Sequence, residues 1–213
     1  MNLDLNQLVK WRREFHRFPE IGWSEFWTTS RIADYLEGLG CFEIFLGKQI
    51  INSDFVRGRK QAVVDKGLAN AKAYGANEKW LEKMEGYTGC VALFDSGKPG
   101  KTIALRFDID CVNVTETRSS EHIPNKEGFA SINDGFMHAC GHDSHITIGL
   151  GVALWIAQNK DKLTGKVKIV FQPAEEGVRG AAAIAQSGII DDADYFASSH
   201  ISFCANTGTV IAN

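Results

Sequence analysis

The sequence lacks the features that mark several large classes of protein. No window of about 18 residues is continuously apolar, so we expect no membrane-spanning helix. Lys and Arg total 23 against 26 Asp and Glu, and a net charge of −3 offers no basic surface for a nucleic acid. The first 20 residues carry charges where a secretory signal needs an apolar core. We therefore expect a cytoplasmic protein that binds neither membranes nor nucleic acids.

Motifs of other enzyme classes are missing too, and cysteine is sparse. There is no Gly-rich phosphate loop and no G-x-S-x-G elbow. The five cysteines are odd in number and widely separated, which is not the pattern of a disulfide framework. We expect one of them to carry chemistry and the others to act as small apolar residues. They are Cys41, Cys90, Cys111, Cys140 and Cys204.

The 213 residues are 44% hydrophobic, enough to bury the core of one domain or somewhat more. Apolar spacing predicts helices over 3–17 and 24–38, followed by a strand over 41–46. Ser24 is the expected N-cap of the second helix, and Gly40 is expected to end it.

Two stretches interrupt this regular pattern. Residues 47–87 are rich in Lys, Ala, Asn and Glu but keep apolar stripes, which predicts a helical insertion on the surface. The polar stretch 113–139 predicts a long loop of the kind that surrounds an active site. The other expected elements are a hairpin of strands over 90–95 and 102–110, a helix over 143–159, a strand over 166–173, a short helix over 179–187 and a strand over 194–200. Their alternation predicts an α/β sheet covered by helices.

Cys140, His142 and Asp143 form a dense polar cluster in "ACGHDSH", where the helix over 143–159 is expected to begin. Cysteine and histidine so close together can reach one point only from an irregular turn, which Gly141 allows. Thiolate and neutral imidazole bind zinc, and manganese or cobalt in sites that also hold carboxylates. Two other interpretations remain open here: a capped helix start with an incidental cysteine, and a nucleophilic cysteine with a histidine base.

Acidic side chains follow two of the expected strands. Glu175 and Glu176 come directly after the strand that ends in "FQP", and adjacent carboxylates repel each other unless a cation is near. One of them can bind a metal while the other takes a proton from water, although a solvated acidic turn is the alternative. Asp108 and Asp110 alternate out of the strand over 102–110 onto one face, where they can orient a ligating histidine.

His200 closes the last expected strand, at the end where α/β sheets usually bind ligands. The alternative is that His200 binds no ligand and only forms hydrogen bonds within the protein. His138 and His145 flank the polar cluster and can support its ligands, but we do not expect them to be ligands themselves. Because all the candidate groups lie at strand ends or at a strand-to-helix turn, we predict that they form one site.

Three parts of the sequence carry a resemblance to a known family. They are "WRREFHRFPEIGWSEFWTTSRIADYLEGLG", "MHACGHDSH", and "FQPAEEGVRGA" together with the strand-terminal His200. Over essentially its whole length the chain resembles the metal-dependent amidohydrolases and peptidases that include hippurate hydrolases, N-acyl-amino-acid deacylases and auxin-conjugate hydrolases. Within them it resembles most the p-aminobenzoyl-glutamate hydrolases. The resemblance implies a zinc-exopeptidase-like catalytic domain, an α/β mixed sheet with helices on both faces.

The resemblance also implies roles for the candidate residues. Cys140, His142, Glu176 and His200 would bind two divalent ions, Zn²⁺ or Mn²⁺, and Glu175 would be the general base. The residues expected to support these ligands are Asp108, Asp110 and Asp143. The implied reaction is hydrolysis of the amide bond of a small N-acyl or N-aroyl amino acid, such as p-aminobenzoyl-glutamate, by metal-activated water.

The chain also departs from the family pattern. "DIDCVNVTE" stands at 108–116 where the family has "DMDALPI.E", which alters the expected wall of the pocket. Relatives continue past the position of Asn213 into a lid and dimerisation domain and a final catalytic segment that supplies a last histidine ligand. Residues 1–213 therefore resemble the N-terminal part of the catalytic domain. We expect weak activity from this chain alone, and either a partner chain for the missing half or a homodimer.

Two other functions compete with this interpretation. A dipeptidase or carboxypeptidase of the same superfamily would use the same chemistry with another pocket. A metal-binding fragment without catalysis would keep the site and lack the rest of the machinery.

Overall fold

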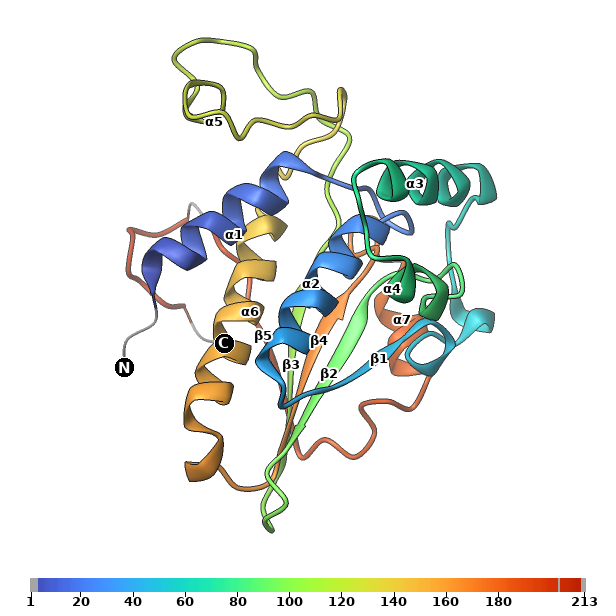
Figure 1. Ribbon diagram of the computed structural model, residues 1–213, viewed down its shortest axis with the longest axis vertical. Helices are drawn as coiled ribbons and strands as arrows, with labels where there is room; N and C mark the ends of the chain where they lie inside the picture. The colour runs from blue at the N-terminus through green and yellow to red at the C-terminus, as the bar shows by residue number, and fades with distance from the viewer. Residues whose placement is uncertain (1–3, 203, 212–213) are drawn as a thin grey trace.

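The computed structural model of the chain describes residues 4–202 and 204–211. A twisted five-stranded sheet runs through the middle of the molecule (Figure 1). In order across the sheet, the strands are β1 (Glu43–Leu46), β2 (Cys90–Asp95), β4 (Lys166–Gln172), β3 (Thr102–Asp108) and β5 (Tyr195–Ser198). β2 runs antiparallel to β1 and β4, whereas β3 is parallel to β4 and β5. The expected mixed sheet is confirmed.

Helices cover both faces of this sheet, as expected. On one face lie α1 (Leu5–Arg17), α2 (Phe26–Leu39) and α6 (His142–Asn159), with α2 and α6 in front of the strands in Figure 1. The short helix α7 (Ala181–Ala185) lies on the opposite face. The α/β class predicted from the sequence is therefore correct.

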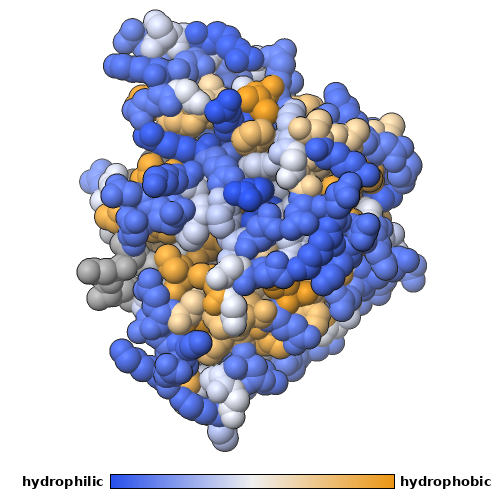
Figure 2. Space-filling model, in the orientation of Figure 1, coloured by the Kyte–Doolittle hydropathy of each residue, from blue (hydrophilic) through white to orange (hydrophobic). Residues whose placement is uncertain are grey.

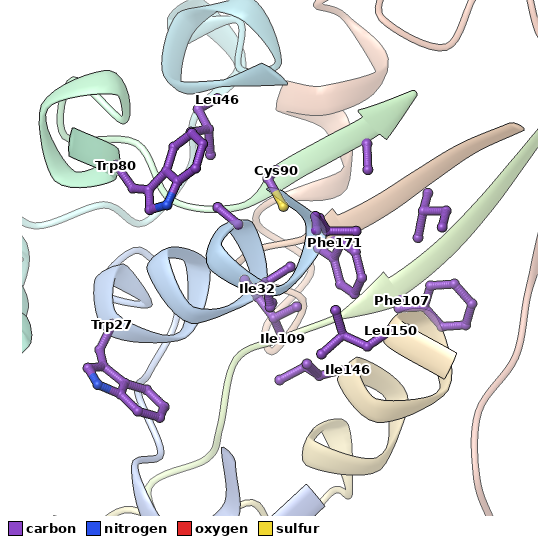
Figure 3. Packing of buried hydrophobic residues seen from close by; sticks show 14 of the residues in the cluster. Trp27, Ile32, Leu46, Trp80, Cys90, Phe107, Ile109, Ile146, Leu150 and Phe171 are labelled. Atoms are coloured by element: carbon purple, nitrogen blue, oxygen red, sulfur yellow. The ribbon is translucent and has the colours of Figure 1, made fainter. Parts of the chain in front are cut away.

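Alternating side chains of β4 contribute to two separate cores. Phe171 packs with Phe107 of β3 and Ile146 of α6 on the first face (Figure 3). Its neighbour Val170 packs with Ile184 of α7 on the other face. Successive residues of a strand point to opposite sides, so consecutive positions of a central strand that is covered on both sides are favoured to be apolar. This explains the apolar run 169–171 in the second half of β4.

The expected hairpin between residues 90–95 and 102–110 is wrong. Both strands form, but β4 lies between them and pairs with each. The turn that joins them wraps around the start of β4, where Ser96 N–H donates to Gly165 and Gly165 N–H donates to Lys98. Turn residues predict a reversal of the chain, but they do not exclude a third strand from entering between the two arms.

The N-cap predicted at Ser24 is also wrong, because the Ser24 hydroxyl donates to the carbonyl of Ile21 instead. The carboxylate of Glu20 accepts the N–H groups of Trp27 and Thr28, at 3.1 and 2.7 Å, in the first turn of α2. A side chain from outside the helix thus satisfies donors that a local cap would have satisfied. The predicted end at Gly40 is correct, with the left-handed φ of 67°.

The polar stretch 47–87 forms the expected helices and packs beside α2. Trp80 is buried there, and its indole N–H donates to Asp34 of α2 at 2.8 Å. Its elements are η1 (Gly47–Gln49), η2 (Ser53–Phe55), α3 (Gln61–Ala73) and α4 (Glu78–Lys83).

The stretch 113–139 is a long loop, as predicted, and contains only the single turn α5 (Ile123–Lys126). Hydrophilic residues cover most of the upper part of the molecule around α5 (Figure 2). The one-turn helix η3 (Lys160–Lys162) follows α6. None of the helices in the described residues is long and apolar enough to cross a membrane.

Candidate metal centre

The parallel strands β3, β4 and β5 end at the same edge of the sheet, and α6 begins there. Each contributes a polar segment: Asp108 ends β3 and Asp110 follows it, and the 173–177 loop follows β4. His200 follows β5, and His142 opens α6. Adjacent parallel strands bring their carboxyl ends together, so topology alone gathers residues separated by up to about a hundred positions.

His142 is the centre of the resulting cluster. Its ligand atom lies within 4.8 Å of those of Cys140 and His200, and also within 4.8 Å of those of Glu175 and Glu176. All five residues proposed from the sequence as ligands or base are therefore brought together. A third group within the same distance joins His142 to Asp108 and His145.

The orientation of the His142 ring leaves one nitrogen available to a cation. Nδ1 lies 2.8 Å from the backbone carbonyl of Asp110, so it carries the proton and donates. Nε2 is fully buried and has no hydrogen-bond partner among the described residues, while carboxylate oxygens of Asp108, Glu175 and Glu176 lie 3.5, 3.9 and 3.9 Å from it. Burial lowers the pKa of His142, but the Asp110 hydrogen bond and the nearby Asp108 outweigh it and raise the pKa. A buried lone pair facing carboxylates fits a divalent metal ion.

Cys140 extends the cluster towards His200, whose Nε2 lies 3.4 Å from its Sγ. Burial, followed by the carboxylates of Glu176, Glu175 and Asp108, raises the pKa of the Cys140 thiol to about 11. A cysteine nucleophile needs a lowered pKa, so this environment argues against nucleophilic catalysis. A metal cation would offset the same negative charges and favour the thiolate as its ligand.

Asp110 fixes the backbone of the loop that carries Glu175 and Glu176. Its two carboxylate oxygens accept the N–H groups of Glu175 and Glu176, each at 3.0 Å. Asp110 is fully buried, while the two glutamate side chains are 35% and 28% exposed and point into the cluster. Asp110 therefore orients His142 through its carbonyl and both glutamates through its carboxylate.

His145 lies within the cluster, whereas the sequence indicated only that it flanks the site. Its Nδ1 lies 2.5 Å from Asp108, and its Nε2 accepts the N–H of Ile201 at 3.0 Å. The ring also stacks on His142, with centroids 5.3 Å apart. The spacing of three residues along one helix face was the signal that could have indicated this proximity.

Asp143, expected to support the ligands, points away from them towards α1. It accepts from His16 Nδ1 at 2.8 Å and pairs with Arg12 at 3.0 Å. The other ring nitrogen of His16 lies 3.0 Å from Glu116 in the long loop. His16 and Glu116 were not predicted as part of any network. Asp143 therefore connects the start of α6 to α1 rather than to a ligand.

The expected family is confirmed by comparison with known proteins. Residues 104–211 match the model of Peptidase family M20/M25/M40. The chain belongs to this family. A Haemophilus influenzae protein, described as a homolog of one of the subunits of p-aminobenzoyl-glutamate hydrolase, is 98% identical over 213 residues, which is 100% of this chain and 50% of that protein. The chain thus spans about half the length of the curated relatives it matches.

Solved structures show the same family relationship. The aminobenzoyl-glutamate utilization protein from Klebsiella pneumoniae superposes with a TM-score of 0.77 at 36% identity, over 95% of this chain and 44% of that one. A Bacillus subtilis protein, described as a dinuclear metal binding peptidase from M20 family, gives a TM-score of 0.68 at 28% identity. That match covers 92% of this chain and 43% of the Bacillus subtilis protein. The similarity extends over nearly all of the sheet and its covering helices.

Proposed function

We propose that this chain carries the metal centre of an enzyme that hydrolyses the amide bond of a small N-acyl or N-aroyl amino acid. The observation that carries the proposal is the buried Nε2 of His142, which has no hydrogen-bond partner in the part of the chain that the structure describes, faces three carboxylates and lies beside a thiol and a second imidazole. Such a donor set binds a divalent cation, and a divalent cation can activate water for the hydrolysis that this peptidase family carries out.

The residues that would hold the metal are Cys140, His142, Glu176 and His200. Two overlapping groups around His142 support a site for two ions, since one is rich in sulfur and imidazole and the other in carboxylates. Thiolate and imidazole favour Zn²⁺, and the carboxylates accommodate Mn²⁺ as well. The description of the Bacillus subtilis relative as dinuclear supports the same count.

Glu175 is the proposed general base. When bound, divalent ions would polarise the amide carbonyl and make a water molecule more acidic. Glu175 would accept the proton of that water and deliver it to the nitrogen of the leaving amine. Its side chain is partly exposed and lies beside His142, so it can reach both the metal centre and an incoming substrate.

We propose p-aminobenzoyl-glutamate, or a close analogue, as the substrate, because the 98% identical relative is described as a homolog of a p-aminobenzoyl-glutamate hydrolase component. That component is one of the subunits of its enzyme, which supports a partner chain that would contribute to the complete pocket.

A cytoplasmic location is supported by the five cysteines, none of which forms a disulfide. A dipeptidase or carboxypeptidase that uses the same centre is the second candidate.

Metal analysis combined with an amide-hydrolysis assay tests the proposal. We expect about two equivalents of Zn²⁺ or Mn²⁺ per chain. His142→Ala should remove most of the bound metal without unfolding the protein. In the complete assembly, release of p-aminobenzoate should depend on that metal. Cleavage of dipeptides but not of p-aminobenzoyl-glutamate would favour the peptidase. Less than one equivalent of metal and no turnover would indicate a non-catalytic fragment.

A further inference from the structure

The loop that carries the two glutamates has an unfavourable backbone conformation. Ala174 and Val178 adopt left-handed φ angles of 51° and 56°, which cost non-glycine residues roughly 1 kcal/mol or more each. The loop is also closed very tightly, since a Cβ at Gly180 would lie 1.8 Å from the carbonyl oxygen of Pro173. Such a loop keeps its shape only if surrounding groups hold it.

Two buried carboxyl groups hold three consecutive N–H groups of this loop. Asp110 accepts those of Glu175 and Glu176. The preceding N–H, that of the left-handed Ala174, donates to Oε1 of Glu25 at 2.7 Å. The other oxygen of Glu25 accepts the hydroxyl of Thr88, at 2.5 Å, just before β2. The loop is therefore fixed at the residue where its backbone is strained.

The burial of Glu25 is not explained by the helix it precedes. Glu25 is fully buried and its side chain caps no N–H of α2, whose first turn is capped by Glu20. No lysine, arginine or histidine pairs with Glu25 among the ion pairs of the described residues. Burying a carboxyl group away from cations is costly, and burial together with Asp110 raises its pKa to about 8. A residue with this cost and no role in its own helix is expected to act elsewhere.

We propose that Glu25 is a positioning residue for the metal centre, acting through the N–H of Ala174 to hold the Glu175–Glu176 loop in its ligating conformation. This inference rests on the proposed function, because it takes the two glutamates as ligand and base. Glu25 touches neither metal nor substrate. Its effect is to keep the carboxylate of Glu176 aimed at His142.

Glu20 provides a matched control in the same segment. It is also a buried glutamate that accepts two hydrogen bonds, but both come from α2 and neither from the loop. Glu20→Leu and Glu25→Leu each remove a buried acceptor and retain an apolar side chain. Both should lower stability, whereas only the second should disturb the metal centre.

The experiment measures Zn²⁺ and Co²⁺ affinity, and the visible absorption spectrum of bound Co²⁺, in the full chain with each substitution. We expect Glu25→Leu to weaken metal binding at least roughly tenfold and to change the Co²⁺ spectrum. Glu20→Leu should leave both readouts near the wild-type values. Glu25→Gln keeps a carbonyl for Ala174 and an amide for Thr88, so it should restore most of the affinity.

Each remaining outcome contradicts a definite claim. Equal losses of metal affinity in the two leucine variants, or no loss in Glu25→Leu, overturn the positioning role while leaving the proposed function intact. A wild-type chain that binds no metal overturns both. If Glu25→Leu does not fold, Thr88→Val removes only one hydrogen bond to Glu25. Unchanged metal affinity and an unchanged Co²⁺ spectrum in that variant then count against the inference.

Discussion

The Nδ1 atom of His142 lies 2.8 Å from the backbone carbonyl of Asp110, and the carboxylate of the same aspartate accepts the N–H groups of Glu175 and Glu176. One residue thus sets the tautomer of the histidine and the direction of both glutamates. Metal sites depend on such contacts, because an imidazole binds through the nitrogen that its other hydrogen bond leaves free.

Asp110→Asn should therefore weaken metal binding by roughly 10- to 100-fold. The asparagine amide can accept one of the two N–H groups, but its NH₂ would face the other. Isothermal titration with Zn²⁺ measures the effect, and circular dichroism checks that the fold is retained. Asp95→Asn, on an exposed strand end paired with Lys166, is the control and should bind as the wild type does. Equal affinity in the two variants would show that Asp110 does not orient the ligands.

His16 gives the fold a defined pH dependence. Burial lowers its pKa, but hydrogen bonds to Asp143 and Glu116 outweigh burial and raise the pKa above 6.5. The folded state therefore binds the His16 proton more tightly than the unfolded state does. This stabilisation is fully present below about pH 6.5 and is lost as the pH rises through the higher folded-state value. Arg12, which also pairs with Asp143, acts in the opposite direction.

His16→Gln removes this contribution. The difference in unfolding free energy between wild type and variant should be larger near pH 6 than near pH 9, as measured by urea unfolding at both values. In an Asp143→Asn background the same substitution should show a much smaller pH dependence, because the main partner is gone. A difference that stays constant with pH in the wild-type background would be inconsistent with a raised pKa.

The members of the candidate metal centre could be predicted from the sequence, because their chemistry is distinctive and their positions are simple. Cys140, His142, Glu176 and His200 all follow strand ends or lie where a helix opens, and parallel strands bring such positions to one edge. Neither the residue chemistry nor the position at a strand end depends on the conformation of the loops. The helix end at Gly40 was equally accessible, since glycine is the usual residue there.

The contacts that hold the centre in place could not be predicted. Glu25 and Ala174 lie 149 positions apart, and nothing in the local pattern around either one indicates a partner. The position of β4 between β2 and β3 could not be predicted either, because pairing between strands that are far apart in the sequence leaves no local pattern. The hydrogen bond from the N–H of Ile201 to His145 was equally hidden, because the two residues lie 56 positions apart.

The central strand β4 should dominate stability. Phe171 is fully buried against Phe107, with ring centroids 6.1 Å apart, so Phe171→Ala removes a large apolar side chain and leaves a cavity. We expect a loss of about 3–5 kcal/mol in the free energy of unfolding, measured by urea titration. Val9→Ala, at a position 47% exposed on α1, should change it by less than about 0.5 kcal/mol. A loss below about 1 kcal/mol for Phe171→Ala would mean that Phe171 is not packed in a rigid core.

Substitutions of Glu175 and Glu176 should have different effects on metal content and on turnover. Glu175→Gln removes the proposed base but no proposed ligand, so metal content should be retained while turnover of p-aminobenzoyl-glutamate falls by roughly 10²- to 10⁴-fold. Glu176→Gln removes a proposed ligand whose buried Oε1 has no hydrogen-bond partner within residues 4–202 and 204–211, so it should lower metal content first and activity as a consequence. Metal analysis and steady-state rates on the same preparations of the complete assembly distinguish the two. Added Zn²⁺ or Mn²⁺ should recover part of the rate of Glu176→Gln and none of that of Glu175→Gln, because excess metal can refill a weakened site but cannot supply a base. Recovery of Glu175→Gln by added metal would reverse the two assignments.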